Sequence, residues 1–202
     1  MINWCYGGRV EKISDIDREI TNCKKCGSLP KLSCNSIKLG NSRVLVLGES
    51  PALDGWIKSG RAFYNVEGKL QASGKILEKL LNLCDLSIDD INFTEVCKCA
   101  ILDRKTLRTC SQNCSQILKK QLNAFDVDII LPMGKFPTET ILGVYINKLS
   151  DVVGKIHKTN INGCEKIVIP IYHTSPINPL SYKGNEKIFK YTIKNLLEGG
   201  NV

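Results

Sequence analysis

The sequence has no long apolar run, no secretion signal and no internal repeat. No apolar stretch approaches the roughly 18 to 20 residues that cross a bilayer. The first twelve residues, MINWCYGGRVEK, contain neither an apolar core nor a small-residue cleavage motif. Low-complexity tracts and long linkers are also absent. We therefore expect a soluble, cytoplasmic protein with no membrane partner.

Length and composition fit a single globular domain. The chain has 202 residues, of which 43% are hydrophobic and 24% are charged, as in proteins that bury a sizeable core. We predict one domain spanning residues 1–202 that acts as a monomer. The formal net charge of +8 favours a polyanionic partner such as nucleic acid. AT-rich coding would produce the same excess of lysine, so charge alone leaves the partner open.

Ten cysteines are unusual for a chain expected in a reducing compartment, where disulfides are rare. Metal or cluster ligation is therefore the better explanation. Cys23 and Cys26 form a C-x-x-C motif, whose two sulfurs can reach one metal centre. A second dense group follows about seventy residues later: Cys97, Cys99, Cys110 and Cys114. Four thiolates suit either zinc or a [4Fe–4S] cluster.

Strand-like and helix-like segments alternate through the middle and the C-terminal part of the chain. Short apolar runs predict strands at residues 43–47, 92–96, 127–131 and 166–172. Helical spacing of leucine and isoleucine predicts helices at about 69–83, 107–124, 137–142 and 185–197. This alternation predicts an α/β fold with three α/β/α layers and a central, mainly parallel, four-stranded sheet.

Polar segments follow each predicted strand. Ligands of such folds bind at the carboxyl ends of the strands, so these segments should share one edge of the sheet. A single site there should collect Glu49, Asp54, Glu95 and His173. Each of the four could also be an ordinary cap or surface group, but their convergence favours a site.

Six short segments occur in order between about residues 20 and 195. They are GESP at 48–51, GRAF at 60–63, FTEVCKC at 93–99, CSQILKKQL at 114–122, GKFPTE at 134–139 and HTSPINP at 173–179. In this order they resemble the motifs of the uracil-DNA glycosylase superfamily, most closely those of its iron–sulfur family 4. The last segment is most similar to the form found in the single-strand-selective monofunctional branch.

The resemblance implies a [4Fe–4S] cluster and assigns its ligands. By position in the motifs they are Cys23, Cys26, Cys99 and Cys114. The choice of Cys97 or Cys110 in place of an assigned ligand stays open. The cluster would tie the N-terminal segment, about residues 1–40, to the rest of the domain. Its role is expected to be structural, because hydrolysis of a glycosidic bond needs no electron transfer.

The implied activity is hydrolysis of the N-glycosidic bond of a flipped-out base in single- or double-stranded DNA, leaving an abasic site. Glu49 would position water and stabilise the oxocarbenium-like transition state, and His173 would donate a hydrogen bond to O2 of the departing base. Asp54 is a possible auxiliary to Glu49. No lysine stands at a motif position as an obvious nucleophile, so we expect base removal without strand cleavage.

The resemblance also implies which residues bind the base and the DNA. The base would be held by Gly48, Ser50, Phe63 and Glu95, with Phe63 stacking on it. The DNA would be contacted by Ser175, Pro176, Ile177 and Lys135, with Ile177 as an apolar wedge in the vacated stack.

Two residues depart from the family patterns. Family 4 has an asparagine where this chain has Glu95. An ionised glutamate accepts from N3–H of uracil but faces O4 with negative charge, which disfavours uracil by about a few kcal/mol. It accepts instead from the N4 amine of cytosine, and a protonated glutamate also donates to N3. Ala52 is small, where the most uracil-strict branch has tyrosine. The base is therefore uracil or a 5-modified cytosine, such as those of phage DNA, and the second would make the protein a defence factor.

A different class of function stays open. A non-catalytic DNA-binding or damage-sensing protein on the same fold would keep the basic charge and the cluster, with Glu95 blocking the base pocket. The presence of both Glu49 and His173 favours the enzyme, because a protein that only binds DNA needs neither.

Overall fold

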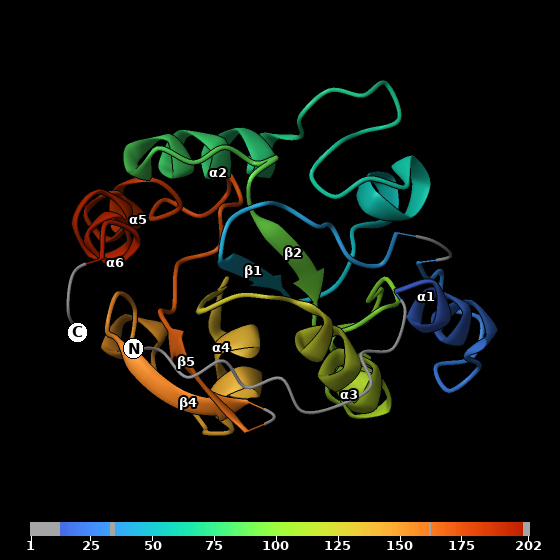
Figure 1. Ribbon diagram of the computed structural model, residues 1–202. Helices are drawn as coiled ribbons and strands as arrows, with labels where there is room; N and C mark the ends of the chain where they lie inside the picture. Colours follow the sequence, from blue (N-terminus) through green and yellow to red (C-terminus); the bar gives the residue numbers. More distant parts are fainter. Residues whose placement is uncertain (1–12, 33–34, 162, 200–202) are drawn as a thin grey trace.

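The computed structural model describes residues 13–32, 35–161 and 163–199. Its centre is a five-stranded sheet in the order β2-β1-β3-β5-β4 (Figure 1). Four neighbouring strands run parallel, and β4 pairs antiparallel with β5 at one edge. The strands are β1 (Val44–Gly48), β2 (Asn92–Glu95), β3 (Ile129–Pro132), β4 (His157–Ile161) and β5 (Cys164–Val168).

Helices cover both faces of this sheet, because its central strands are apolar on both sides. Along β1, Val44 and Val46 belong to one buried core, and Leu45 and Leu47 belong to the other. In Figure 1, α2, α5 and α6 lie on one side of the sheet, and α3 and α4 lie on the other. The helices are α1 (Ile13–Asn22), α2 (Ala72–Leu81), α3 (Leu107–Ala124), α4 (Lys135–Leu142), α5 (Lys183–Lys187) and α6 (Lys194–Leu197).

Shorter helical turns complete the layers. The turn η5 joins α5 to α6, so that residues 183–197 form one continuous helical segment whose buried side chains pack with those of α2. The other turns lie in the connecting loops. Together they are η1 (Leu53–Ile57), η2 (Asn82–Cys84), η3 (Arg104–Thr106), η4 (Leu149–Asp151) and η5 (Ile188–Ile193).

The predicted three-layer α/β/α fold is confirmed, with two additions. The four predicted parallel strands form, but β4 adds a fifth strand that the sequence did not reveal. Its residues, HKTNI, are only half-buried at best, so no apolar run marks it. The helix α1 was not predicted, although Ile13, Ile16 and Ile20 stand at helical spacing; its buried Ile16 and Ile20 pack one turn apart against the core. The last parallel strand is Cys164–Val168, but hydrogen bonding to the β3 segment continues beyond it, because the N–H groups of Ile169 and Ile171 donate to the carbonyls of Ile130 and Pro132 at 3.0 Å.

The parallel strands end together and thereby define one edge of the sheet. Gly48 at the end of β1 is the register partner of Glu95 at the end of β2. Beyond β3, Met133 bridges to Ile171, and the N–H of Gly134 donates to the carbonyl of Ile171 at 2.9 Å. Gly134 has a φ of +101°, a conformation that favours glycine, and α4 begins directly after it.

No helix among the described residues is long and apolar enough to span a membrane. Of the ten cysteines, Cys5 and Cys34 lie outside the described residues, as does part of the N-terminal segment that the cluster is predicted to tie down. The assignment of residues 1–202 to one domain stays a prediction.

Candidate active site and thiol cluster

A cavity of about 690 Å³ opens at the carboxyl ends of the strands. Five residues predicted from the sequence line it: Glu49, Ser50, Glu95, Lys135 and His173. The remaining lining residues are Arg104, Lys105, Leu107, Arg108, Met133, Gly134, Phe136 and Glu139. The structure therefore brings together both predicted catalytic residues and the residue predicted to read the base edge.

Glu95 lies at the floor of this cavity. Its side chain packs against the backbone of Gly48, where a Cβ atom would overlap the Glu95 carboxyl group. Glu95 is only 8% exposed, and its buried Oε2 atom has no hydrogen-bond partner among the described residues. A buried carboxyl oxygen without a partner is costly, which is typical of a group that awaits a ligand.

Burial raises the pKa of Glu95 to about 8. The Glu49 carboxylate raises this pKa further, and the ammonium group of Lys98 opposes the shift. Lys98 is itself buried, and its Nζ atom donates to Thr94 Oγ1 at 3.1 Å and to the Glu95 carbonyl. At neutral pH Glu95 is therefore mostly a protonated acid, which offers one O–H donor and one carbonyl acceptor.

Glu49 pairs with Arg104 at the side of the cavity. The two guanidinium nitrogens face the two carboxylate oxygens, with Nη1 bonded to Oε1 and Nη2 at 3.3 Å from Oε2. The Glu49 side chain is 21% exposed, whereas that of Arg104 is 73% exposed. The arginine thus covers the carboxylate from the solvent side.

His173 is held with a defined ring nitrogen toward the protein. Its Nδ1 atom accepts from the backbone N–H of Ser175 at 3.0 Å, and Asn178 Nδ2 donates to the His173 carbonyl at 3.0 Å. Desolvation lowers the pKa of His173, against the opposing effect of the Glu49 carboxylate. The ring is therefore neutral at neutral pH with its proton on Nε2, because Nδ1 acts as an acceptor. Nε2–H is available as a donor.

Three of the four residues predicted to contact DNA follow His173 in one loop, and the fourth, Lys135, lies in α4. Ile177 is 91% exposed, which is unusual for an isoleucine and matches the predicted wedge. Ser175 and Pro176 precede it at the same rim. Lys135 lies at the start of α4, where its Nζ atom donates to the Asn147 carbonyl at 3.2 Å.

Three other sequence candidates lie outside the residues that line the cavity. Phe63 is buried, with its ring centroid 4.4 Å from that of Phe93. Its φ of +68° is a strained conformation for an aromatic residue, and such strain clusters at functional sites. Because Phe63 does not line the cavity, base stacking by this residue stays a prediction. Asp54 is exposed and pairs with Lys58, and Ala52 is also exposed; an auxiliary role for Asp54 has no support from its position.

Sequence reasoning missed the cationic side chains of the cavity. Arg104, Lys105 and Arg108 come from one segment between the predicted cluster ligands Cys99 and Cys114. No motif marks these residues. Arg104 and Lys105 lie in a connecting segment without apolar periodicity, and Arg108 lies in the first turn of α3. Their charge is the only signal in the sequence, and it does not distinguish them from other surface cations.

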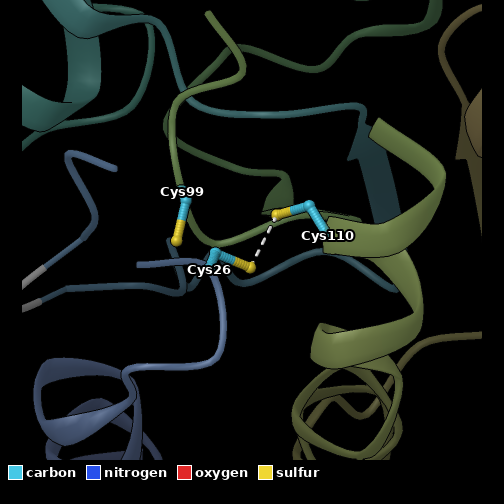
Figure 2. Close-up of side chains that lie close together, drawn as sticks. All are labelled: Cys26, Cys99 and Cys110. Carbon is cyan, nitrogen blue, oxygen red and sulfur yellow. Dashed lines mark hydrogen bonds between the residues drawn. The ribbon is translucent and has the colours of Figure 1, made fainter. Parts of the chain in front are cut away.

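A group of thiols lies beside the active site. The Sγ atoms of Cys26, Cys99 and Cys110 all lie within 4.8 Å of one another. They come from the loop after α1, the loop after β2 and α3 (Figure 2). The Sγ atoms of Cys26 and Cys110 are 3.5 Å apart. Cys97 and Cys114 adjoin the group through interactions with Cys110.

The donor set of this thiol group suits an iron–sulfur cluster or zinc. Three of the four predicted ligands, Cys26, Cys99 and Cys114, are in or next to it, and the Lys98 N–H lies 3.4 Å from the Cys114 sulfur. A hydrogen bond with Cys110 lowers the pKa of Cys114 to about 6, which favours the thiolate that ligation needs. Among the described residues, the fourth predicted ligand, Cys23, is not part of the three-sulfur group, whereas Cys110, which the sequence left as an alternative ligand, is part of it.

A parallel sheet with two carboxyl groups and a neutral histidine at one edge is suited to hydrolysis. Comparison with known proteins identifies the class: the model of the "Uracil DNA glycosylase superfamily" matches residues 35–197. The chain belongs to this superfamily, and it is therefore a DNA glycosylase, a hydrolase of N-glycosyl bonds.

Two relatives share most of the chain. A type-4 uracil-DNA glycosylase of Archaeoglobus fulgidus is 30% identical over 175 residues, which cover 83% of this chain and 84% of the relative. A type-4 uracil-DNA glycosylase of Pyrobaculum aerophilum is 27% identical over 168 residues, which cover 78% of this chain and 80% of the relative. The resemblance to family 4 is thus confirmed.

Proposed function

We propose that the protein removes a pyrimidine base from DNA by hydrolysis and leaves the strand intact. The observation that supports this most directly is the convergence of Glu49, Glu95 and His173 in one cavity. The reaction needs a group that stabilises positive charge on the sugar and a donor for the departing base. Glu49 supplies the first, and Nε2–H of His173 supplies the second.

Water is the proposed nucleophile, since no lysine stands at a motif position as an obvious nucleophile; Lys105, which also lines the cavity, is exposed. Lys98 is buried and donates to Thr94, and the Nζ atom of Lys135 is held by the Asn147 carbonyl. In our proposal Glu49 orients the water, and stabilises the cation that develops at C1′ as the bond to the base breaks. A neutral His173 hydrogen-bonds the O2 atom on which negative charge accumulates.

A [4Fe–4S] cluster is the proposed cofactor. The thiol group fits such a cluster. The motifs imply Cys23, Cys26, Cys99 and Cys114 as its ligands, and Cys110 is an alternative ligand because its sulfur lies close to those of Cys26 and Cys99. Bound there, the cluster would supply cross-links between the loop after α1, the loop after β2 and α3. Its contribution would be to hold these segments beside the cavity.

Uracil is the first candidate for the base. The two relatives are named as uracil-DNA glycosylases, and Glu95 stands where family 4 has asparagine. The repulsion expected between uracil O4 and an ionised Glu95 is largely removed at neutral pH, because the acid is mostly protonated there. A protonated acid accepts from N3–H and donates to O4, as an amide does.

A 5-modified cytosine is the second candidate. The same protonated acid donates to N3 of cytosine and accepts from its N4 amine. Glu95 can therefore pair with uracil and with cytosine, whereas the family's asparagine, in the orientation that reads uracil, pairs with uracil. Ala52, small where the most uracil-strict branch has tyrosine, is the residue that favours a substituent at C5. Excision limited to a modified base would spare the host's own cytosine and direct the enzyme against phage DNA.

The test of the proposed function is base release from oligonucleotides by the wild type and by His173→Ala. An enzyme loses turnover in this variant while it keeps most of its affinity for DNA. A non-catalytic DNA-binding protein releases no base in either form, and that result would overturn the proposal.

A further inference from the structure

Three cations of the cavity come from one short segment. Arg104, Lys105 and Arg108 all line the cavity and all are exposed. Arg104 pairs with Glu49. Within the part of the chain that the structure describes, Lys105 and Arg108 have no carboxylate at ion-pair distance. This cluster therefore carries positive charge that the protein itself leaves unneutralised.

The segment is positioned by the protein on both sides. Asp103 Oδ1 accepts from the Lys105 N–H at 2.9 Å and so fixes the turn that carries Arg104. Leu107 is buried in the core between Arg104 and Arg108, and its carbonyl is 3.8 Å from the Cys97 sulfur. The three cations are thus presented from an anchored turn.

The pair between Arg104 and Glu49 is suited to exchange. Ion pairs of exposed side chains stabilise proteins little, and the Arg104 side chain is 73% exposed. A phosphate offers the same two-oxygen geometry to a guanidinium as a carboxylate does. A phosphate that approaches from solvent therefore meets Arg104 before it meets Glu49, with Lys105 and Arg108 close by.

We infer that Arg104, Lys105 and Arg108 form a binding site for a backbone phosphate of the DNA strand that carries the target base. In the DNA-free protein the Glu49 carboxylate occupies the arginine of this site. When the phosphate binds Arg104, both oxygens of Glu49 are released to face water and sugar. DNA binding thereby frees the catalytic carboxylate. This inference rests on the proposed function, because it takes DNA as the substrate.

The first experiment measures binding to duplex DNA that contains a tetrahydrofuran abasic-site analogue, which cannot be cleaved as a substrate. Fluorescence anisotropy across a salt series gives the affinity and its salt dependence. Loss of one phosphate contact in Arg104→Ala should flatten the slope of log K against log salt by about 0.9, with binding about three- to tenfold weaker. The control is Arg18→Ala, which removes a 70% exposed arginine that pairs with Asp15 on α1 and leaves the slope unchanged.

The second experiment tests the exchange itself by a double-mutant cycle. Glu49→Gln removes the competing carboxylate and should tighten binding to the same duplex several-fold when Arg104 is present. In the Arg104→Ala background this gain should be lost. Glu139→Gln is the matched control, because it removes another carboxylate of the same cavity and should change affinity equally in both backgrounds.

The outcomes separate this inference from the proposed function. An unchanged salt slope in Arg104→Ala, or an equal effect of Glu49→Gln in both backgrounds, overturns the exchange while the glycosylase proposal stands. If the wild-type protein binds none of three DNA types, the inference and the proposed function are both overturned. These are the duplex with the analogue, single-stranded DNA with the same analogue, and DNA that contains only ordinary or candidate bases.

Discussion

The Glu95 carboxyl group occupies the space directly over the Cα atom of Gly48, its register partner on the neighbouring strand. Glycine is required at position 48 by this contact and not by its backbone dihedral angles, since Gly48 lies in a regular strand. The first motif and the base-reading position are therefore physically coupled across β1 and β2.

Gly48→Ala should disturb the site through this contact. The added methyl group overlaps the Glu95 carboxyl, so we expect destabilisation by about 1 to 3 kcal/mol and loss of base release. Glu95→Ala removes the overlapping group, and the double variant should recover most of the lost stability. Chemical denaturation of the four proteins measures this coupling, and additive effects would contradict the contact.

The stability of the protein should fall as the pH rises from about 5 to 8. The pKa of Glu95 is raised from its ordinary value of 4.5 to about 8, so between these values the folded state holds a proton that the unfolded state releases. The loss amounts to about 3 kcal/mol over this range. Glu95→Gln stays neutral and should lack this part of the pH dependence. Parallel denaturation curves at pH 5.5 and 8 test it, and identical pH dependence in the two proteins would refute the assignment.

Release of uracil should have an alkaline limb that belongs to Glu95. Above pH 8 the acid ionises, loses its donor to O4 and turns negative charge toward that atom, so the rate falls by up to tenfold per pH unit. Glu95→Asn presents an amide that does not titrate and should keep uracil release level through this range. Single-turnover rates from pH 6.5 to 9.5 provide the comparison. An alkaline limb that persists in Glu95→Asn assigns it to another group.

The cluster ligands can be distinguished by single serine substitutions. If the motif assignment holds, Cys23→Ser and Cys114→Ser lose most of the bound iron and sulfide. Cys110→Ser keeps both, although Cys110 lies 3.5 Å from Cys26. Iron and sulfide analysis of the purified variants decides between the two sets. Loss of iron in Cys110→Ser with retention in Cys23→Ser would replace the motif assignment by the group that proximity defines.

Ile177→Ala should separate duplex from single-stranded substrates. The exposed side chain is expected to fill the gap that a flipped nucleotide leaves in a duplex, and no such gap has to be filled in a single strand. Base release from duplex DNA should fall about tenfold or more, with little change on single strands. An equal loss on both substrates would show that Ile177 does not act as a wedge.

The parallel core of the fold was predictable because its signals are local. Buried runs such as residues 43–47 mark central strands whatever surrounds them, and each of the four predicted strands forms. The edge strand β4 and the helix α1 depend on contacts with distant segments. The pattern of β4, HKTNI, is mostly polar, so only the folded chain reveals it. The pattern of α1, ISDIDREITN, is polar apart from three isoleucines at helical spacing, which are the one local signal that it offers.

The site divides in the same way. Glu49, Glu95 and His173 were found because the ends of parallel strands meet at one edge, which is a rule of topology. The protonation of Glu95 was not predictable, since it depends on how deeply the carboxyl is buried beside Gly48. The pairing of Arg104 with Glu49 joins residues 55 positions apart through a loop with no regular pattern.

The glycosylase activity is tested most directly by single-turnover base release from end-labelled oligonucleotides, read by alkaline cleavage at abasic sites. The panel carries uracil, hypoxanthine, cytosine, 5-hydroxymethylcytosine and its glucosylated form, each in single- and double-stranded DNA. The wild-type protein should produce alkali-labile sites from uracil, from a 5-modified cytosine or from both, and His173→Ala should produce none. Release of no base from any of these substrates by a folded, DNA-binding protein would contradict this prediction.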